Sequence, residues 1–127
     1  MTHNLSLYHV PFQSIVHQAK TVEVRLNDQE VSTVIVGDHI RFFLEDDPAR
    51  TVLCKVTTLE SYISFLALYK DVAFEQMDCN GWTIDEMMNA TYKLYTPEEE
   101  KAYGALAIGI EVVDVDKQQS EGNDNGD

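Results

Sequence analysis

Three charged side chains near the start of the chain have the types and the spacing to bind a polar ligand. Lys20, Glu23 and Arg25 lie within one short segment. If that segment is extended, Glu23 and Arg25 share a face, because successive side chains of a strand point to opposite sides. A guanidinium binds a phosphate or a carbonyl through two parallel hydrogen bonds, and a carboxylate accepts from the amino group of a nucleobase.

The same residues also support a structural interpretation. Glu23 and Arg25 can form an intramolecular ion pair across the strand, which would stabilise the fold and bind nothing. The sequence leaves both interpretations open, and one does not exclude the other.

A helix followed by a strand is predicted to position these residues. Apolar side chains repeat at helical spacing through residues 12–19, and residues 21–26 alternate strictly between apolar and polar. Lys20 therefore stands at the junction. Further strands are predicted at residues 5–7, 31–36, 39–44 and 50–56.

The second half of the chain predicts helices and one closing strand. An apolar stripe runs from Tyr62 to Tyr69, and helix starts are expected at Thr83 and Thr96 from their capping patterns. After Gly104 a last strand carries small residues on one face, which indicates a closely packed neighbour there. This order of strands and helical insertions predicts an α+β fold with a mixed β-barrel.

Composition limits the classes of partner. The net charge is −13, although residues 1–60 hold eight acids and five bases and so carry only −3. A field of this sign disfavours long duplex nucleic acid. No apolar run approaches the roughly 20 residues that span a bilayer, and no signal peptide is recognised, so we expect no membrane partner and a cytoplasmic location with both cysteines reduced. The histidines and cysteines show no metal-ligand spacing, so neither a metal nor another cofactor is expected.

Taken together, the motifs resemble the ASCH domain family. They are Lys20 after a helix, Glu23 and Arg25 as an x-Glu-x-Arg strand, the Gly37-Asp38 turn, a helical middle with Tyr and Phe, and the stretch from Tyr92 to Gly104 before the last strand. The likeness runs from Leu5 to Val113. In one departure, Gln18-Ala19 stand where the family carries a glycine before the lysine.

The resemblance implies a PUA-like mixed β-barrel with flanking helices and a cleft. The domain is expected to span residues 1–115, followed by a disordered acidic tail over residues 116–127. The implied partner is RNA or a nucleotide-like small molecule, bound in a cleft lined by Lys20, Glu23 and Arg25. The oligomeric state stays open.

Further candidates for this cleft follow later in the chain. Tyr95 and Tyr103 would supply a stacking platform, and Glu98 an acid above it. In the alternative interpretation, both tyrosines lie at the edge of the core and Glu98 only stabilises a helix start. Trp82 is expected to anchor packing, and the run Glu98–Glu100 to form a solvated helix face.

Two other functions remain as alternatives. One subgroup of the family hydrolyses N4-acetylcytidine with a lysine, a threonine three residues later and a distant glutamate. Lys20 matches the lysine, but Glu23 stands at the threonine position. In an amidohydrolase, Lys20 and Glu23 would be the catalytic candidates. The second alternative is an acidic protein-interaction module.

Overall fold

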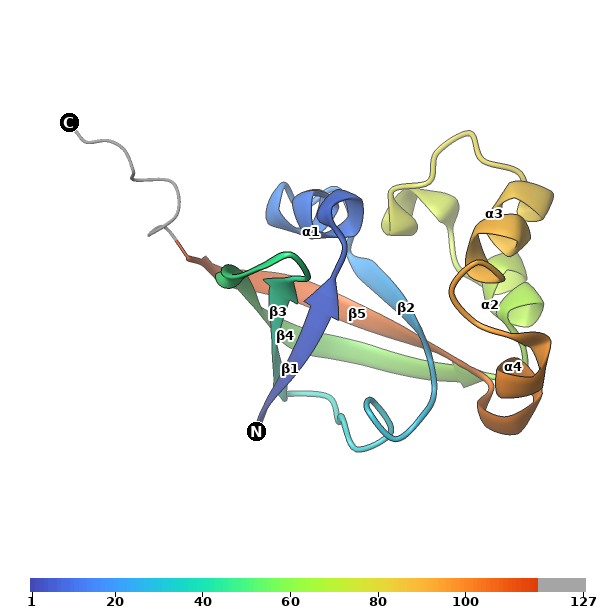
Figure 1. Ribbon diagram of the computed structural model, residues 1–127, viewed down its shortest axis with the longest axis horizontal. Coiled ribbons are helices and arrows are strands. Elements are labelled where there is room, and N and C mark those ends of the chain that lie inside the picture. Colours follow the sequence, from blue (N-terminus) through green and yellow to red (C-terminus); the bar gives the residue numbers. More distant parts are fainter. Residues whose placement is uncertain (117–127) are drawn as a thin grey trace.

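The fold is built on one curled, five-stranded sheet. The computed structural model describes residues 1–116. The sheet has the order β1-β3-β4-β5-β2, in which β1 and β3 run parallel and the other neighbours antiparallel (Figure 1). The strands are β1 (Thr2–Leu7), β2 (Val22–Leu26), β3 (His39–Leu44), β4 (Asp47–Tyr62) and β5 (Ala105–Val115). The predicted α+β class is confirmed, as a half-barrel flanked by helices.

Helices lie at both sides of this sheet. They are α1 (His9–Val16), α2 (Phe65–Asp71), α3 (Ile84–Thr91) and α4 (Pro97–Tyr103), with a short 3-10 helix η1 (Phe74–Met77). Thr83 and Thr96 cap α3 and α4 with complete capping boxes, as their sequence patterns predicted. None of the helices in residues 1–116 has the length and apolarity that crossing a bilayer requires.

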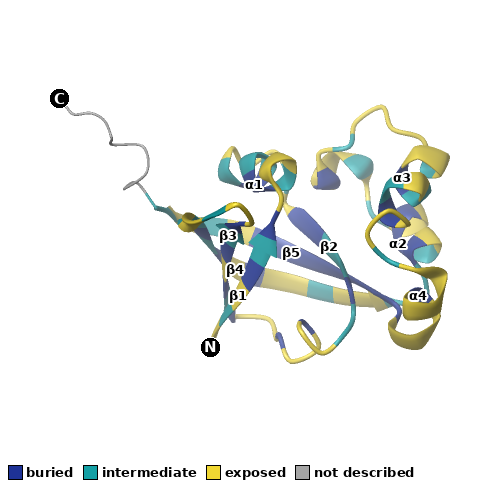
Figure 2. Ribbon diagram, viewed as in Figure 1, coloured by how far each residue is buried: buried dark blue, intermediate teal, exposed yellow. Residues whose placement is uncertain are grey.

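Two hydrophobic cores share the sheet, one on each face. Leu106, Ile108 and Ile110 of β5 belong to the core inside the half-barrel, together with residues of α1. Ala105 and Ala107 point the other way, into a core formed with α2 and α3. Figure 2 shows β2 and β5 as largely buried ribbons between these layers. The small face predicted for the last strand is thus covered by the helices.

The two edge strands, β1 and β2, face each other across the opening of the half-barrel. Each pairs with one neighbour only, and the sheet order places them at opposite ends. We call the line along which β1 and β2 approach each other the seam. One side chain crosses it, because the Arg25 guanidinium on β2 donates a hydrogen bond to the Ser6 carbonyl on β1. A cavity lined by residues of both strands, including Ser6 and Arg25, lies beside this contact.

Residues 31–36 are not a strand, so the prediction there is wrong. They form turns with local hydrogen bonds, including those from the Val31 and Ser32 amides to the Asp28 carbonyl. Val31 and Val34 are buried at the i, i+3 spacing of a helical turn, so their apolar character serves the core without a strand. The Asp38 carboxylate accepts from the Ile35 amide at 3.1 Å and fixes the end of this loop.

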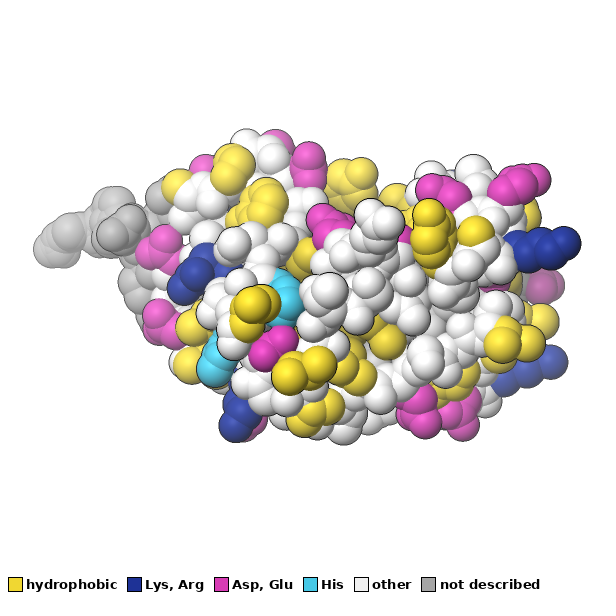
Figure 3. Space-filling view, turned by 90° about the horizontal axis from the view of Figure 1, so that it is seen from below, with side chains coloured by type: hydrophobic (Ala, Val, Ile, Leu, Met, Phe, Trp, Pro, Cys, Tyr) yellow, Lys and Arg dark blue, Asp and Glu magenta, His cyan; other side chains and the backbone are white. Residues whose placement is uncertain are grey.

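The charged surface is uneven. On the face drawn in Figure 3, Lys and Arg side chains lie toward the two ends, with acidic and hydrophobic side chains between them. Asp116 continues from β5, its amide bonded to the Thr51 carbonyl. The rest of the predicted acidic tail lies outside the described residues.

Candidate functional site

The turn after α1 places Lys20 beside the seam. The Ala19 and Lys20 amides both bond to the Ser14 carbonyl, which closes the helix and redirects the chain into β2. Gln18 has a φ of 62°, in the left-handed region that favours glycine. The turn that leads into Lys20 thus takes the backbone form that glycine adopts most easily, with a glutamine at that position.

Glu23 lies at the centre of a buried ionic triad. Its Oε2 accepts from Arg25 Nε at 2.7 Å, and its Oε1 lies 2.9 Å from Lys20 Nζ. The residue is only 3% exposed. The alternation predicted for β2 is confirmed, because Val22 and Leu26 lie on the other face of the strand, in the core formed with α2 and α3.

The triad holds Glu23 in its ionised form. Burial by itself raises the pKa of Glu23, but the positive charges of Lys20 and Arg25 and the hydrogen bond from Arg25 outweigh it. The pKa of Glu23 therefore lies below its ordinary value. Arg25 is buried too, and its attraction to Glu23 raises its pKa despite the opposing effect of burial. Glu23 and Arg25 are therefore both charged at neutral pH.

A cavity of about 270 Å³, lined by charged as well as apolar side chains, opens onto the triad. Its walls come from the β1–α1 connection, β2, the β3–β4 turn and the segment after α3. Besides the triad, its lining includes Ser6, Tyr8, Glu45 and Tyr95. Two cations and two carboxylates line it, so the cavity offers both donors and acceptors and no large excess of either charge. We call it the polar half.

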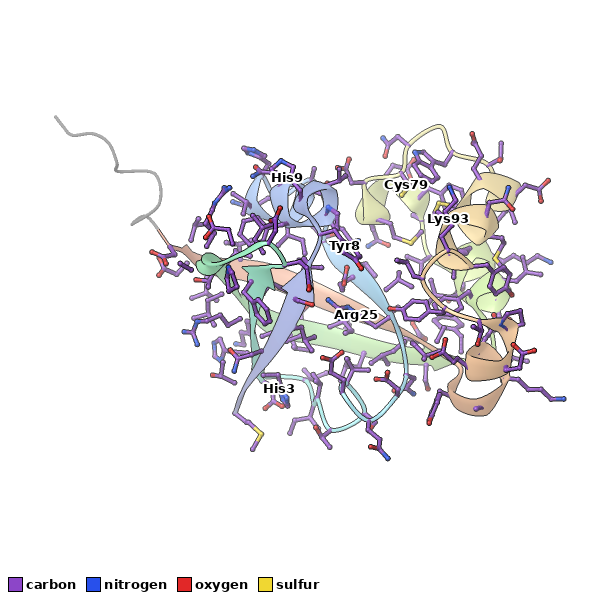
Figure 4. The ribbon with its side chains drawn as sticks, viewed as in Figure 1. His3, Tyr8, His9, Arg25, Cys79 and Lys93 are labelled. Atoms are coloured by element: carbon purple, nitrogen blue, oxygen red, sulfur yellow. The ribbon has the colours of Figure 1, made fainter. Side chains whose placement is uncertain are left out.

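A second cavity of about 290 Å³ adjoins the first and is mainly apolar. We call it the apolar half. The two share four lining residues, Pro11, Lys20, Val24 and Leu94. The apolar half extends between α1 and α3, where Trp82 and Cys79 contribute to its wall. Figure 4 shows Tyr8 and Arg25 on the sheet side of this region and Cys79 on the side of the helices.

Trp82 does not anchor the core, contrary to the sequence-based expectation. Its side chain is 45% exposed and stands at the wall of the apolar half. The loop between η1 and α3 carries it, and the buried positions of that region are filled by Met77 and Met87 instead.

The structure brings together four of the six predicted ligand-binding residues. Tyr95 joins Lys20, Glu23 and Arg25 in the lining of the polar half. Its ring stacks on Phe65, with centroids 5.4 Å apart and planes at 9°. Burial raises the pKa of Tyr95, which keeps the phenol protonated.

Tyr103 and Glu98 lie elsewhere. Tyr103 lines a separate depression with Asn27, Tyr62 and Lys101 at the end of α4. Glu98 is exposed in the first turn of α4 and lines neither half of the cleft. The length of the helix separates Tyr103 from Tyr95, because Tyr95 precedes α4 and Tyr103 ends it.

Sequence reasoning missed several polar contacts. Glu100 is buried and accepts from the Phe65 amide at 2.7 Å and from the Tyr92 hydroxyl, so it is not part of a solvated face. Tyr8 and Glu45 line the polar half, although nothing in their local sequence marks them. Among residues 1–116, no group of three or more His, Cys, Asp or Glu side chains is placed to hold a metal ion.

Comparison with known proteins agrees with this fold. The model of the ASCH domain matches residues 5–114. No protein of curated function matches the chain. The chain is similar to the crystal structure of hypothetical protein PH0355, with 26% identity over 89% of this chain and 100% of that one, at a TM-score of 0.78.

Two further solved structures share the fold. One is the solution structure of protein PF0455 from Pyrococcus furiosus, with 25% identity over 89% of this chain and 98% of that one and a TM-score of 0.69. The other is the crystal structure of ASCH from Zymomonas mobilis, with 12% identity over 87% of this chain and 66% of that one and a TM-score of 0.54. At this identity the second supports the fold alone.

Proposed function

Because this chain belongs to the ASCH domain family, we propose that it binds RNA or a nucleotide-like small molecule in the polar half of its cleft. Arg25 and Lys20 supply the donors, and Glu23 supplies an acceptor for the amino group of a nucleobase. Tyr95 forms part of the wall against which the base lies.

The cavity beside the triad carries this proposal. Lys20, Glu23 and Arg25 all line it, so a ligand there meets two basic side chains and a carboxylate on one wall. Hydrogen bonds to ionised groups are roughly twice as strong as those between neutral groups. Both a structural ion pair and a binding site are therefore compatible with the same three residues.

Equilibrium binding of nucleosides tests the proposal. Isothermal titration calorimetry would compare cytidine and its 5′-monophosphate with uridine and its 5′-monophosphate, because uracil lacks the exocyclic amino group. We expect tighter binding of the cytosine compounds by about tenfold, within the ~1–3 kcal/mol that a good base contact contributes. Glu23→Gln should reduce this preference, because the neutral amide is a weaker acceptor.

Glu98→Gln is the matched control, since Glu98 is exposed and lines neither half. It should leave all affinities unchanged. If none of the nucleosides or mononucleotides binds at millimolar concentration while the protein is folded, the proposal is wrong.

Hydrolysis of N4-acetylcytidine is the second candidate, because Lys20 and Glu23 lie close enough to act on one substrate. The lowered pKa of Glu23 makes it a weak general base, however. We therefore expect slow or absent turnover in a chromatographic assay with the acetylated nucleoside. Turnover that Glu23→Gln abolishes would favour the amidohydrolase over the binding module.

The acidic protein-interaction module remains the third candidate. The cavity beside the triad is open, and side chains do not fill it. This feature favours a small ligand over a partner that would contact the acidic surface alone.

A further inference from the structure

The cleft has two halves of similar size but different chemistry. The polar half measures about 270 Å³ and the apolar half about 290 Å³. Each falls near the lower limit for a ligand site, whereas both together lie within the usual range of ~300–1,000 Å³. A ligand that fills the whole cleft therefore has two parts of comparable size, and the part in the apolar half presents apolar surface to the wall.

The wall of the apolar half suits a flat ring. Trp82 offers a half-exposed indole, and Met87 and Val10 add soft apolar surface. Three hydroxyls lie on this wall. Those of Tyr69 and Thr91 bond to each other at 2.6 Å, and Ser14 carries the third. Stacking on an aromatic side chain such as Trp82 tolerates any base.

Lys20 stands where the two halves meet. It lines both cavities, so its ammonium can face a group that links a ring in one half to a ring in the other. Asp78 also lines the apolar half and disfavours an anion deeper inside it. The place for a single negative charge in the ligand is therefore the junction.

We propose that the cleft takes two successive nucleotides of a single strand. One base lies in the polar half against Glu23 and Arg25, the linking phosphodiester lies at Lys20, and the second base lies in the apolar half against Trp82. This inference rests on the proposed function, because it assigns a nucleobase to the polar half and extends the ligand from there.

The single tryptophan gives a direct readout. Trp82 is the only tryptophan of the chain, so quenching of its fluorescence reports occupancy of the apolar half. Titration with the dinucleotide CpA should quench it, and titration with cytidine should not. By calorimetry CpA should bind about tenfold tighter than cytidine, since stacking of one base is worth this much.

Variants separate stacking from a general effect. Trp82→Ala should remove the advantage of CpA over cytidine, and Trp82→Phe should keep most of it. Tyr103→Ala is the matched control, because Tyr103 is an exposed aromatic residue that lines neither half, and its change should have no effect. CpA with an uncharged methylphosphonate linkage should bind several-fold more weakly than CpA, as expected if Lys20 faces the phosphodiester.

The outcomes distinguish the two proposals. If neither cytidine nor CpA binds, the proposed function fails and this inference fails with it. If cytidine binds as tightly as CpA and the fluorescence stays unchanged, the polar half is a nucleoside site and the two-nucleotide inference is overturned. If hexanoate quenches Trp82 and CpA does not, the apolar half accepts an aliphatic chain, and the inference is likewise overturned.

Discussion

Arg25 has three partners at once. Its Nε binds Glu23, an Nη atom donates to the Ser6 carbonyl across the seam, and the other Nη lies 3.8 Å from Glu30. A guanidinium suits this position because its donors are fixed in one plane and it stays charged when buried. The residue therefore links the binding chemistry of the cleft to the closure of the half-barrel.

Replacing Arg25 with methionine should destabilise the protein strongly. The variant Arg25→Met leaves Glu23 buried with Lys20 as its remaining ionic partner, and breaking a buried pair in this way costs about 3–5 kcal/mol. The double variant Glu23→Leu with Arg25→Met should recover part of the loss, because it removes the buried carboxylate as well. Urea denaturation of both variants gives the free energies of unfolding.

The recovery should be incomplete, since the Ser6 carbonyl still loses its donor. Neither variant should bind nucleosides under the proposed function. If Arg25→Met were as stable as the wild type, water would have to solvate Glu23 where Arg25 now binds it. That result would refute the structural role of Arg25.

Asp38 should make stability depend on pH in the acid range. A hydrogen bond with His3 and one from the Ile35 amide lower its pKa from 3.8 to about 2. An acid with a lower pKa in the folded state stabilises the fold above its ordinary pKa, and this contribution is lost as the pH falls through the folded value. The melting temperatures of wild type and Asp38→Asn should therefore differ at pH 7 and converge between about pH 4 and pH 2.

Asp46→Asn provides the control for that comparison, because Asp46 lies exposed in the β3–β4 turn. Its melting curve should follow the wild type at every pH. If the difference in melting temperature between wild type and Asp38→Asn stays constant down to pH 2, the lowered pKa of Asp38 does not contribute to stability and the prediction is wrong.

At the scale of elements, the junction between α4 and β5 depends on Gly104. Its φ is +74°, and a Cβ there would lie 2.5 Å from the Tyr62 carbonyl oxygen. Gly81 also has a positive φ, +84°, but a Cβ there would meet nothing within 4 Å.

Gly81→Ala should cost only the backbone strain of about 1–2 kcal/mol. Gly104→Ala should cost more, by about 1–3 kcal/mol, because the backbone must also move. Thermal unfolding of the two variants measures the difference, and equal losses would show that Tyr62 shifts freely.

Regular elements were predictable because their periodicity records burial on one face. The alternation of β2 and the capping boxes of α3 and α4 are local signals, and the structure confirms them. The strand predicted at residues 31–36 was wrong. β-Branched residues favour strands, whereas here Val31 and Val34 enter the core from successive turns. The packing of this loop against the half-barrel therefore outweighed the preference of its β-branched residues for a strand.

The cleft was predictable only in part, because much of it is assembled by long-range packing. Lys20, Glu23 and Arg25 stand close together in sequence, so their convergence followed from one strand. Trp82 and Glu45 join the cleft through elements far along the chain. Glu100 looked solvated within an acidic run, yet its carboxylate accepts a hydrogen bond from the Phe65 amide, 35 residues earlier in the chain.

At the scale of the whole molecule, charge should limit the partner to a short strand. The net charge is −13, and the face in Figure 3 shows acids between its separated cations. Few basic side chains are available to release counterions from a long duplex. We expect no duplex binding in an anisotropy titration at physiological salt. Dinucleotide binding should have a shallow salt dependence, with a slope of about −0.7 for one phosphate. Tight duplex binding with a steep slope would contradict a small cleft.

The pairing of β2 with β5 has a consequence for biosynthesis. β2 ends at Leu26 and pairs only with β5, which begins at Ala105, about 80 residues later. A chain synthesised at roughly 5–20 residues per second therefore makes β2 wait about 4–16 s for its partner strand. During that interval water solvates Glu23 and Arg25, because the partner strand that helps to bury them is absent. The cleft is thus among the last parts of the nascent protein to form, and a chain that stops before β5 carries its residues without the site.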